Sequence, residues 1–164
     1  MLYFADAKWW RWHRERDEFR AFAGEKCSIW SSGNEIDDPQ VNILRNAGSE
    51  GLSDDAGALC TGSNSGYQAV NLAYLAGAAR IVLVGYDAKP GPKGERHWFG
   101  DHPDRSSAPY AHMVKAFREL AGRLAAAGIE VINATPASAI ECFRKEPLET
   151  ALLALQGNEI AGSV

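Results

Sequence analysis

The stretch from Asn64 to Asp87 constrains the fold more than any other part of the chain. Residues 64–76 are almost wholly apolar and are followed by Gly77, which predicts a buried helix closed by a glycine. The run Ile81-Val82-Leu83-Val84 comes next and contains no polar residue. An uninterrupted apolar strand is typical of parallel sheets that are covered on both faces. We therefore expect a helix between parallel strands, with the strand at 81–84 in the centre of the sheet.

Strand and helix patterns alternate along the rest of the chain. Short apolar or alternating runs predict strands at residues 2–5, 26–30, 41–44 and 129–133. Apolar residues at helical spacing predict helices at 7–23, from Pro109 until Gly128 stops it, and at 147–155. This alternation predicts a three-layer α/β sandwich with a mostly parallel sheet. We expect one domain over residues 1–156, followed by a frayed tail at 157–164.

The overall composition excludes several classes of protein. The chain has 164 residues, a length that can form a substantial core. Its 17 basic and 21 acidic side chains give a net charge of -4, so it has no general attraction to nucleic acid or anionic lipid. No apolar run approaches the roughly 20 residues of a membrane span, and the first residues do not form a signal peptide. Three widely spaced cysteines favour a reducing, cytoplasmic location, and no spacing is typical of a metal site.

Residues 61–68 carry the strongest local signal for a binding site. Glycines and polar side chains stand directly before the predicted central helix, in the order Thr61, Gly62, Ser63, Asn64, Ser65, Gly66 and Tyr67. The start of a helix attracts anions, and these side chains can bond to a phosphate, a ribose or a sugar. The segment matches neither a P-loop nor a Gly-x-Gly-x-x-Gly fingerprint. A structural interpretation also stands, because Ser65 and Gln68 fit a capping box.

A polar stripe runs along the predicted central helix. Tyr67, Asn71 and Tyr74 are spaced so that they share one side of it. We expect this stripe to face a neighbouring element of the chain, although Tyr67 is also a candidate for ligand contact.

Polar residues also follow the predicted strands. Ligands of open α/β sheets bind at the carboxyl ends of the strands, where Asp6, Asp87 and Asn133 are expected. We therefore predict one cleft that these residues line together with the 61–66 loop, with Asp87 as a catalytic acid or base. Alternatively, Asp6 and Asp87 cap the segments that follow them.

The segment 88–108 is a long predicted loop, and it contains a second concentration of reactive side chains. His97 and His102 lie close together there, near Asp101. Histidine titrates near neutral pH, so both are candidates for proton transfer. The alternative is that Trp98 and Phe99 hold the loop on the core while the histidines are solvated.

The segments 64–77 and 81–87 resemble a Rossmann-like superfamily. It includes domain-of-unknown-function family 115, related to hydroxymethylpterin pyrophosphokinase, and the bacterial sialyltransferases that use CMP-sialic acid. Both groups show a Ser-Gly helix start, a small-residue helix and a strand that ends in Gly-x-Asp, as Gly85-Tyr86-Asp87 does here. The segment 131–136 resembles the Asn-Ala-Thr loop of the first group, which adds Thr135 to the candidate residues. The chain looks most like short uncharacterised proteins of tailed phages and prophages.

This resemblance implies that the Ser65-Gly66 turn and Asp87 face a nucleotide or nucleotide sugar. The implied activity is that of a glycosyltransferase-like or pyrophosphokinase-like transferase. The alternative is a catalytically degenerate binding or assembly module of a phage-encoded pathway. Members of the superfamily begin with a strand and a Gly-x-Gly-Pro-Ser turn, which this chain lacks before Leu2, so we expect an N-terminally short version.

The tryptophans near the start of the chain suggest a partner surface. A missing first strand would expose apolar surface, and large exposed apolar patches usually mark contacts with another chain. We therefore expect Leu2 to Phe4 to pair inside the sheet. We also expect a homo-oligomer anchored by Trp9, Trp10 and Trp12, because tryptophan is a frequent anchor of interfaces. The alternative is a monomer that packs all three into its own core.

Overall fold

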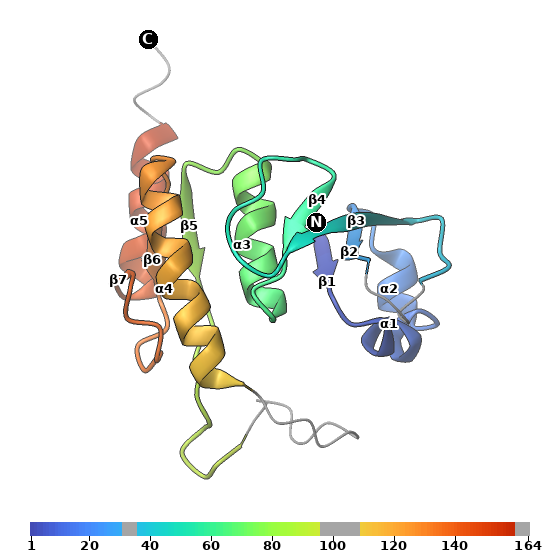
Figure 1. Ribbon diagram of the computed structural model, residues 1–164, viewed down its shortest axis with the longest axis horizontal. Coiled ribbons are helices and arrows are strands. Elements are labelled where there is room, and N and C mark those ends of the chain that lie inside the picture. The colour runs from blue at the N-terminus through green and yellow to red at the C-terminus, as the bar shows by residue number, and fades with distance from the viewer. Residues whose placement is uncertain (31–35, 96–108, 160–164) are drawn as a thin grey trace. The chain divides into compact units, whose positions relative to one another are not determined.

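The computed structural model describes residues 1–30, 36–95 and 109–159 (Figure 1). The chain divides into two compact units, Met1–Ala76 and Gly77–Val164. The single domain over residues 1–156 stays a prediction. None of the helices in the described ranges is both long enough and apolar enough to span a bilayer.

The chain is an α/β protein. The first unit contains β1 (Leu2–Phe4), α1 (Ala7–His13), α2 (Asp17–Ala21), β2 (Lys26–Ile29), β3 (Val41–Gly48), β4 (Ala58–Cys60) and α3 (Ser65–Leu75). The second unit contains β5 (Arg80–Leu83), α4 (Tyr110–Ala126), β6 (Glu130–Asn133), β7 (Arg144–Lys145) and α5 (Leu148–Glu159). Strands β1 and β5 are followed by helices, whereas β2, β3 and β4 follow one another without a described helix between them. Every strand pairing between these elements is parallel, as predicted for a Rossmann-like fold.

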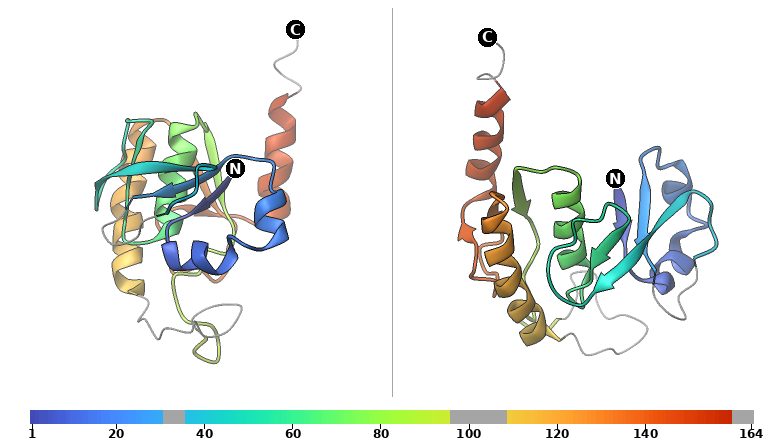
Figure 2. Two further views of the ribbon diagram at one scale, coloured as in Figure 1. Left: turned by 90° about the vertical axis from the view of Figure 1, so that its right-hand side faces the viewer. Right: turned by 45° about the horizontal axis from the view of Figure 1, so that its top comes forward.

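The sheet of the first unit has the strand order β1-β2-β3-β4 and lies between two layers of helices. Figures 1 and 2 show α3 on one side of this sheet and α1 and α2 on the other. Successive side chains of a strand point to opposite faces, so β1 contributes to both layers. Phe4 packs with Trp10 and Phe19 on the α1–α2 side, whereas Tyr3 packs with Leu72 on the α3 side. The predicted three-layer arrangement is present in this unit.

The predicted helix at 7–23 is interrupted. The chain leaves the helical conformation at Arg16, whose backbone is extended, and α2 begins one residue later. The break contains neither proline nor glycine, so local propensity does not explain it. The turn brings Phe19 into the cluster around Phe4, with the two rings 6.0 Å apart at their centres. Burial of this aromatic side chain outweighs the continuity of the helix.

The three tryptophans of the predicted interface have different environments. Trp10 is 4% exposed and belongs to the core, and Trp9 stacks on His13 and contacts Phe4. Trp12 is 42% exposed. One of the three is therefore a core residue, and the homo-oligomer stays a prediction.

The sheet of the second unit has the order β5-β6-β7. The prediction that the 81–84 strand is central is wrong for this sheet, because β6 lies in the middle and β5 pairs only with β6 among the described strands. Ile81 and Leu83 are buried, but Val84 is 55% exposed. The prediction that Leu2 to Phe4 pair inside the sheet is also wrong, since β1 pairs only with β2 among the described strands. An apolar run shows that a strand has packing partners on its faces, but not how many strands flank it.

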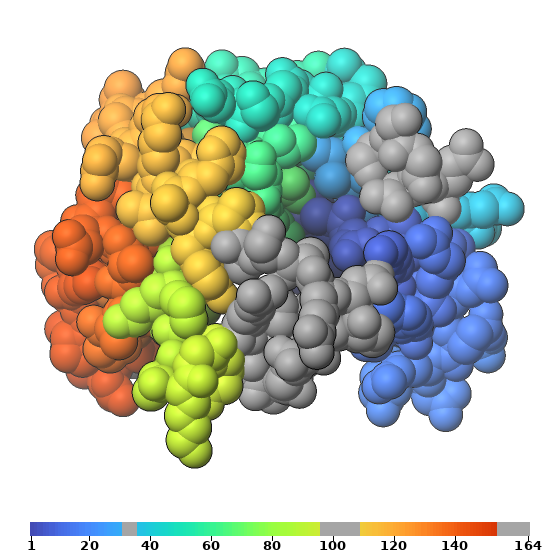
Figure 3. Space-filling model, turned by 60° about the horizontal axis from the view of Figure 1, so that its bottom comes forward, coloured from blue at the N-terminus to red at the C-terminus, as the bar shows by residue number. Residues whose placement is uncertain are grey.

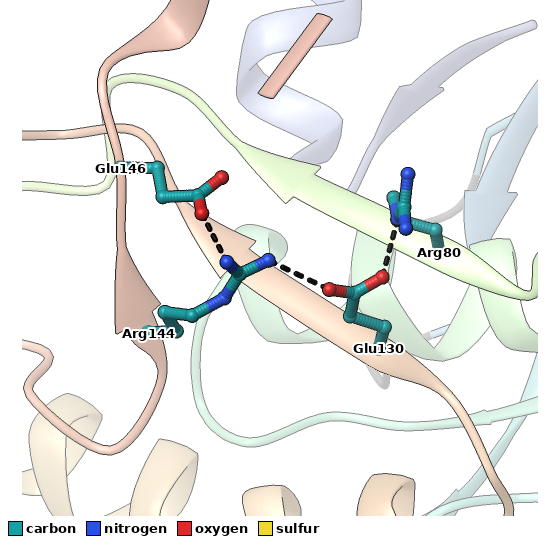
Figure 4. A network of polar contacts seen from close by, with 4 residues as sticks. All are labelled: Arg80, Glu130, Arg144 and Glu146. Carbon is teal, nitrogen blue, oxygen red and sulfur yellow. Dashed lines mark hydrogen bonds and ion pairs between the residues drawn. The ribbon is translucent and has the colours of Figure 1, made fainter. Parts of the chain in front are cut away.

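The second unit is held together by an apolar helix face and by a polar network. Helix α4 buries Phe117, Leu120 and Leu124. A chain of ion pairs joins the three strands of this sheet to the residue that follows β7. It runs through Arg80, Glu130, Arg144 and Glu146 (Figure 4). The Arg80 guanidinium, and secondarily that of Arg144, lowers the pKa of the Glu130 carboxyl below its usual value. Glu130 thus connects β5 with the two-residue strand β7.

Candidate functional site

The loop between β4 and α3 is the best-defined candidate site in the first unit. Asn64 is the N-cap of α3, and its side-chain oxygen accepts a hydrogen bond from the Tyr67 N–H at 2.8 Å. The capping box predicted from Ser65 and Gln68 is therefore wrong. Asn64 performs the capping, so Ser65 is the first helical residue and its side chain is exposed.

Two consecutive residues of this loop have left-handed backbone conformations. Gly62 has φ +50 and Ser63 has φ +56. A glycine is required at 62, because an added Cβ would lie 2.0 Å from Cγ of the Tyr67 ring. Serine adopts this conformation at a cost of about 1–2 kcal/mol. Such strain is concentrated at functional sites, and here it belongs to an exposed hydroxyl-bearing residue.

The rest of the loop is fixed by hydrogen bonds to the sheet. The N–H groups of Thr61 and Gly62 donate to the carbonyls at the end of β3 and just beyond it, each at 2.8 Å. The amide of Gln68 donates to the Thr61 carbonyl and accepts from the Tyr3 hydroxyl on β1 at 2.6 Å. Burial raises the pKa of that hydroxyl far above its usual value, so Tyr3 remains a neutral donor. The loop is therefore held in one arrangement before any ligand binds.

The polar stripe on α3 faces the segment that connects β3 with β4, as its spacing indicated. The Tyr67 hydroxyl donates to the Gly51 carbonyl and accepts from the Gly51 N–H. The Asn71 side chain is fully buried and bonds to both backbone groups of Ser53 and to the Cys60 N–H. Tyr74 donates to Asp54. The structure thus gives Tyr67 a packing role, with 1% of its surface exposed.

Asp6 has the helix-capping role, which was one of the two interpretations of this residue from the sequence. It lies directly after β1, and its carboxylate accepts a hydrogen bond from the Lys8 N–H at 2.7 Å as the N-cap of α1. Its side chain remains exposed at the carboxyl end of the strand.

In the second unit, Asp87 lies on a loop that is fastened to the loop after β6. The Tyr86 N–H donates to the Thr135 hydroxyl, and the Ala139 N–H donates to the Asp87 carbonyl at 2.8 Å. Ala88, the next residue, has φ +49. Ser63 and Ala88 are the non-glycine residues with positive φ in the described part of the chain, and both follow the carboxyl end of a strand. The Asp87 side chain is exposed, and Figure 3 shows the segment after β5 projecting from the surface in yellow-green.

Asn133 and Thr135 hold the loop after β6 in shape. Asn133 is fully buried, donates to the Ile140 carbonyl and accepts from the Thr135 N–H, both at 3.0 Å. Thr135 is 6% exposed and uses its hydroxyl to accept from Tyr86. These side chains act on the backbone of the chain itself, whereas Asp87 presents its carboxylate outward.

Several predictions are not decided by these observations. His97 and His102 lie outside the described residues. The predicted cleft combines Asp6 and the 61–66 loop of one unit with Asp87 and Asn133 of the other, so their convergence stays a prediction. Within the ranges that the structure describes, no group of three or more His, Cys, Asp or Glu side chains is arranged to hold a metal ion.

The cysteines show no sign of a reactive thiol. Cys27 and Cys60 are buried and Cys142 is half-buried, and none of the three forms a disulfide with another described residue. Burial raises the pKa of Cys27 and of Cys142, which lowers the fraction of nucleophilic thiolate at neutral pH.

Comparisons with known proteins do not assign the chain to a family. No family model, no curated protein and no solved structure matches it. The function is therefore argued from the site itself. Sequence reasoning located both strained loops, but it did not single out Ala88, because alanine carries no signal for a left-handed backbone.

Proposed function

We propose that the chain binds a nucleotide or nucleotide sugar at the loop between β4 and α3, and that it acts as a transferase on that ligand. The observation that carries the proposal is the strained Gly62-Ser63 pair directly before the helix. The loop is already rigid, and a pre-formed site loses little conformational freedom on binding. The exposed hydroxyls of Ser63 and Ser65 stand where the helix start favours negative charge.

The phosphate groups of the ligand would interact with the start of α3. The chain as a whole is acidic, so this local positive potential, and not a general basic surface, would select the anion. Asp87 is the candidate acid or base for the transfer step, because its carboxylate is exposed at the end of a parallel strand.

The second candidate function is a binding or assembly module without turnover. It is favoured by Asn133 and Thr135, since both of these candidate ligand residues bond to the chain's own backbone. In a module of this kind, Asp87 would be an exposed carboxylate without a second catalytic side chain among the described residues.

Ser65→Asp tests the binding proposal. An aspartate in the first turn interacts favourably with the helix dipole, so the free protein should keep or slightly increase its stability, by about 0.3–1 kcal/mol. The same charge should repel a phosphate and weaken binding at least tenfold. Thermal shift with a panel of nucleotides and nucleotide sugars identifies the ligand, since 100 times the dissociation constant adds about 2.7 kcal/mol of stability. Titration calorimetry then measures the affinity.

Thr150→Asp is the matched control, because Thr150 is exposed in the first turn of α5. It should leave ligand affinity unchanged. Equal affinity of Ser65→Asp and the unsubstituted chain, or no nucleotide shift at all, would contradict the proposal. Once binding is shown, turnover of the bound nucleotide sugar separates the two candidates. A transferase turns the ligand over, and Asp87→Asn should abolish that turnover. A binding module shows no turnover even in the unsubstituted chain.

A further inference from the structure

A cavity in the first unit is lined by charged side chains of both signs. It has a volume of about 400 Å³ and lies beside α1 and α2. This volume is in the range of small-molecule sites. Arg14, Arg20, Asp37 and Asp38 are all among its lining residues. None of these residues belongs to the loop before α3.

The two arginines are held together by one carboxylate. Glu15 accepts from Arg20 and lies 3.4 Å from Nε of Arg14. The Arg14 guanidinium also stacks over the Trp10 ring, 4.8 Å from its centre. A guanidinium has five N–H donors, so two such groups around one carboxylate retain donors for a further anion. Glu15 thus positions a pair of cations at the cavity.

Trp10 lines this cavity, and it carries a buried donor without a partner. The side chain is 4% exposed, and its indole N–H is buried without a hydrogen-bond partner. Buried polar groups are rarely left unpaired in native proteins. A carboxylate oxygen is an acceptor that suits both an indole N–H and a guanidinium.

The acidic part of the cavity has the opposite preference. Asp38 accepts from the Gln40 N–H at 2.9 Å, and neither Asp37 nor Asp38 forms an ion pair with the described residues. Carboxylates without a cationic partner can bind an ammonium group. With Glu15 counted, three carboxylates face two guanidinium groups, so an anionic ligand alone would not satisfy the site.

We propose that this cavity binds a free α-amino acid or a closely related zwitterion. Its carboxylate contacts Arg14 and Arg20. Its ammonium group lies on the side of Asp37 and Asp38. The proposal is independent of nucleotide binding, because the two sites share no residue.

The test screens the full chain against the twenty standard L-amino acids at about 10 mM. This concentration is about ten times a millimolar dissociation constant. Thermal shift selects the best binder, and titration calorimetry measures its affinity. Its N-acetyl derivative, which lacks the ammonium charge, and its amide, which lacks the carboxylate, should each bind at least tenfold more weakly. Acetate alone should not stabilise the protein.

Variants place the ligand in this cavity. Arg20→Gln and Asp37→Asn should each reduce affinity at least tenfold, and both residues are exposed enough for the fold to tolerate the change. Arg16→Gln is the matched control, because Arg16 is an exposed neighbour that does not line the cavity. Three results would overturn the proposal: no amino acid shifts the melting temperature, the derivatives bind as well as the parent, or Arg20→Gln binds as well as Arg16→Gln.

Discussion

Gly62 is the position at which a single added methyl group should be most destructive. A Cβ there would lie 2.0 Å from Cγ and 2.4 Å from Cδ2 of Tyr67. Because these atoms belong to the ring, a small movement at the end of a flexible side chain cannot relieve the clash. The ring is buried between the loop and the Gly51 backbone, so Gly62→Ala must displace it.

The expected loss of stability has three parts. The left-handed backbone costs alanine about 1–2 kcal/mol. Displacement of a packed ring costs about 1–3 kcal/mol, as overpacking usually does. Weakening the two Tyr67–Gly51 hydrogen bonds costs about 1 kcal/mol each. The sum is at least about 3 kcal/mol, even if the hydrogen bonds survive in part.

Urea unfolding followed by tryptophan fluorescence measures this loss. Four of the five tryptophans lie in residues 1–76, so the signal reports mainly on the unit that contains Gly62. Gly77→Ala is the matched control: φ there is +81, but an added Cβ would meet nothing within 4 Å. It should therefore cost only the backbone strain, about 1–2 kcal/mol. If the two variants lose the same free energy of unfolding, the steric argument is refuted.

Three further substitutions test individual contacts. Tyr67→Phe leaves both backbone groups of Gly51 without their buried partner, and urea unfolding should show a loss of about 2 kcal/mol, whereas no loss would mean that water replaces the hydroxyl. The folded-state pKa of Glu130 lies below the ordinary glutamate pKa of 4.5. Its ion pairs therefore stabilise the fold at pH values above 4.5, and this stabilisation is lost as the pH falls through the lower folded-state pKa. The melting temperature of Glu130→Gln should thus lie below that of the unsubstituted chain at pH 7 and converge with it in acid, and a gap independent of pH would contradict this. Ala88→Gly relieves a left-handed alanine at some entropic cost, so chemical denaturation should show a gain of up to about 1 kcal/mol, and a loss would argue against strain at this position.

Much of the architecture could be predicted because it follows from local pattern. The apolar helix before Gly77 and the strand at Arg80–Leu83 occur where their apolar runs placed them. Their alternation led to a parallel α/β fold, which the structure confirms. The short strands β4 and β7 were not predicted, because three or two residues carry no measurable period and depend on their neighbours for hydrogen bonds.

The candidate site was predictable in place but not in detail. Glycine and hydroxyl residues before a helix identify a polar loop at the helix start, and the 61–66 segment is such a loop. Which side chain caps the helix depends on backbone angles, and the extended backbone of Asn64 decided that against Ser65. Similarly, Asn133 and Asp87 both follow strands, yet one is fully buried and the other exposed.

The sequence by itself therefore determined where the apolar helices and strands and the polar loops lie, because these depend on residues that are near neighbours in the chain. The parallel pairing was inferred from the order of strands and helices. Only the tertiary structure decided which strand lies in the middle of a sheet, where the first helix breaks to bury Phe19, and which polar side chains remain available to a ligand. These features depend on partners that are distant in the sequence. The Tyr3–Gln68 bond spans 65 residues and the Tyr86–Thr135 bond spans 49, so no local pattern contains them.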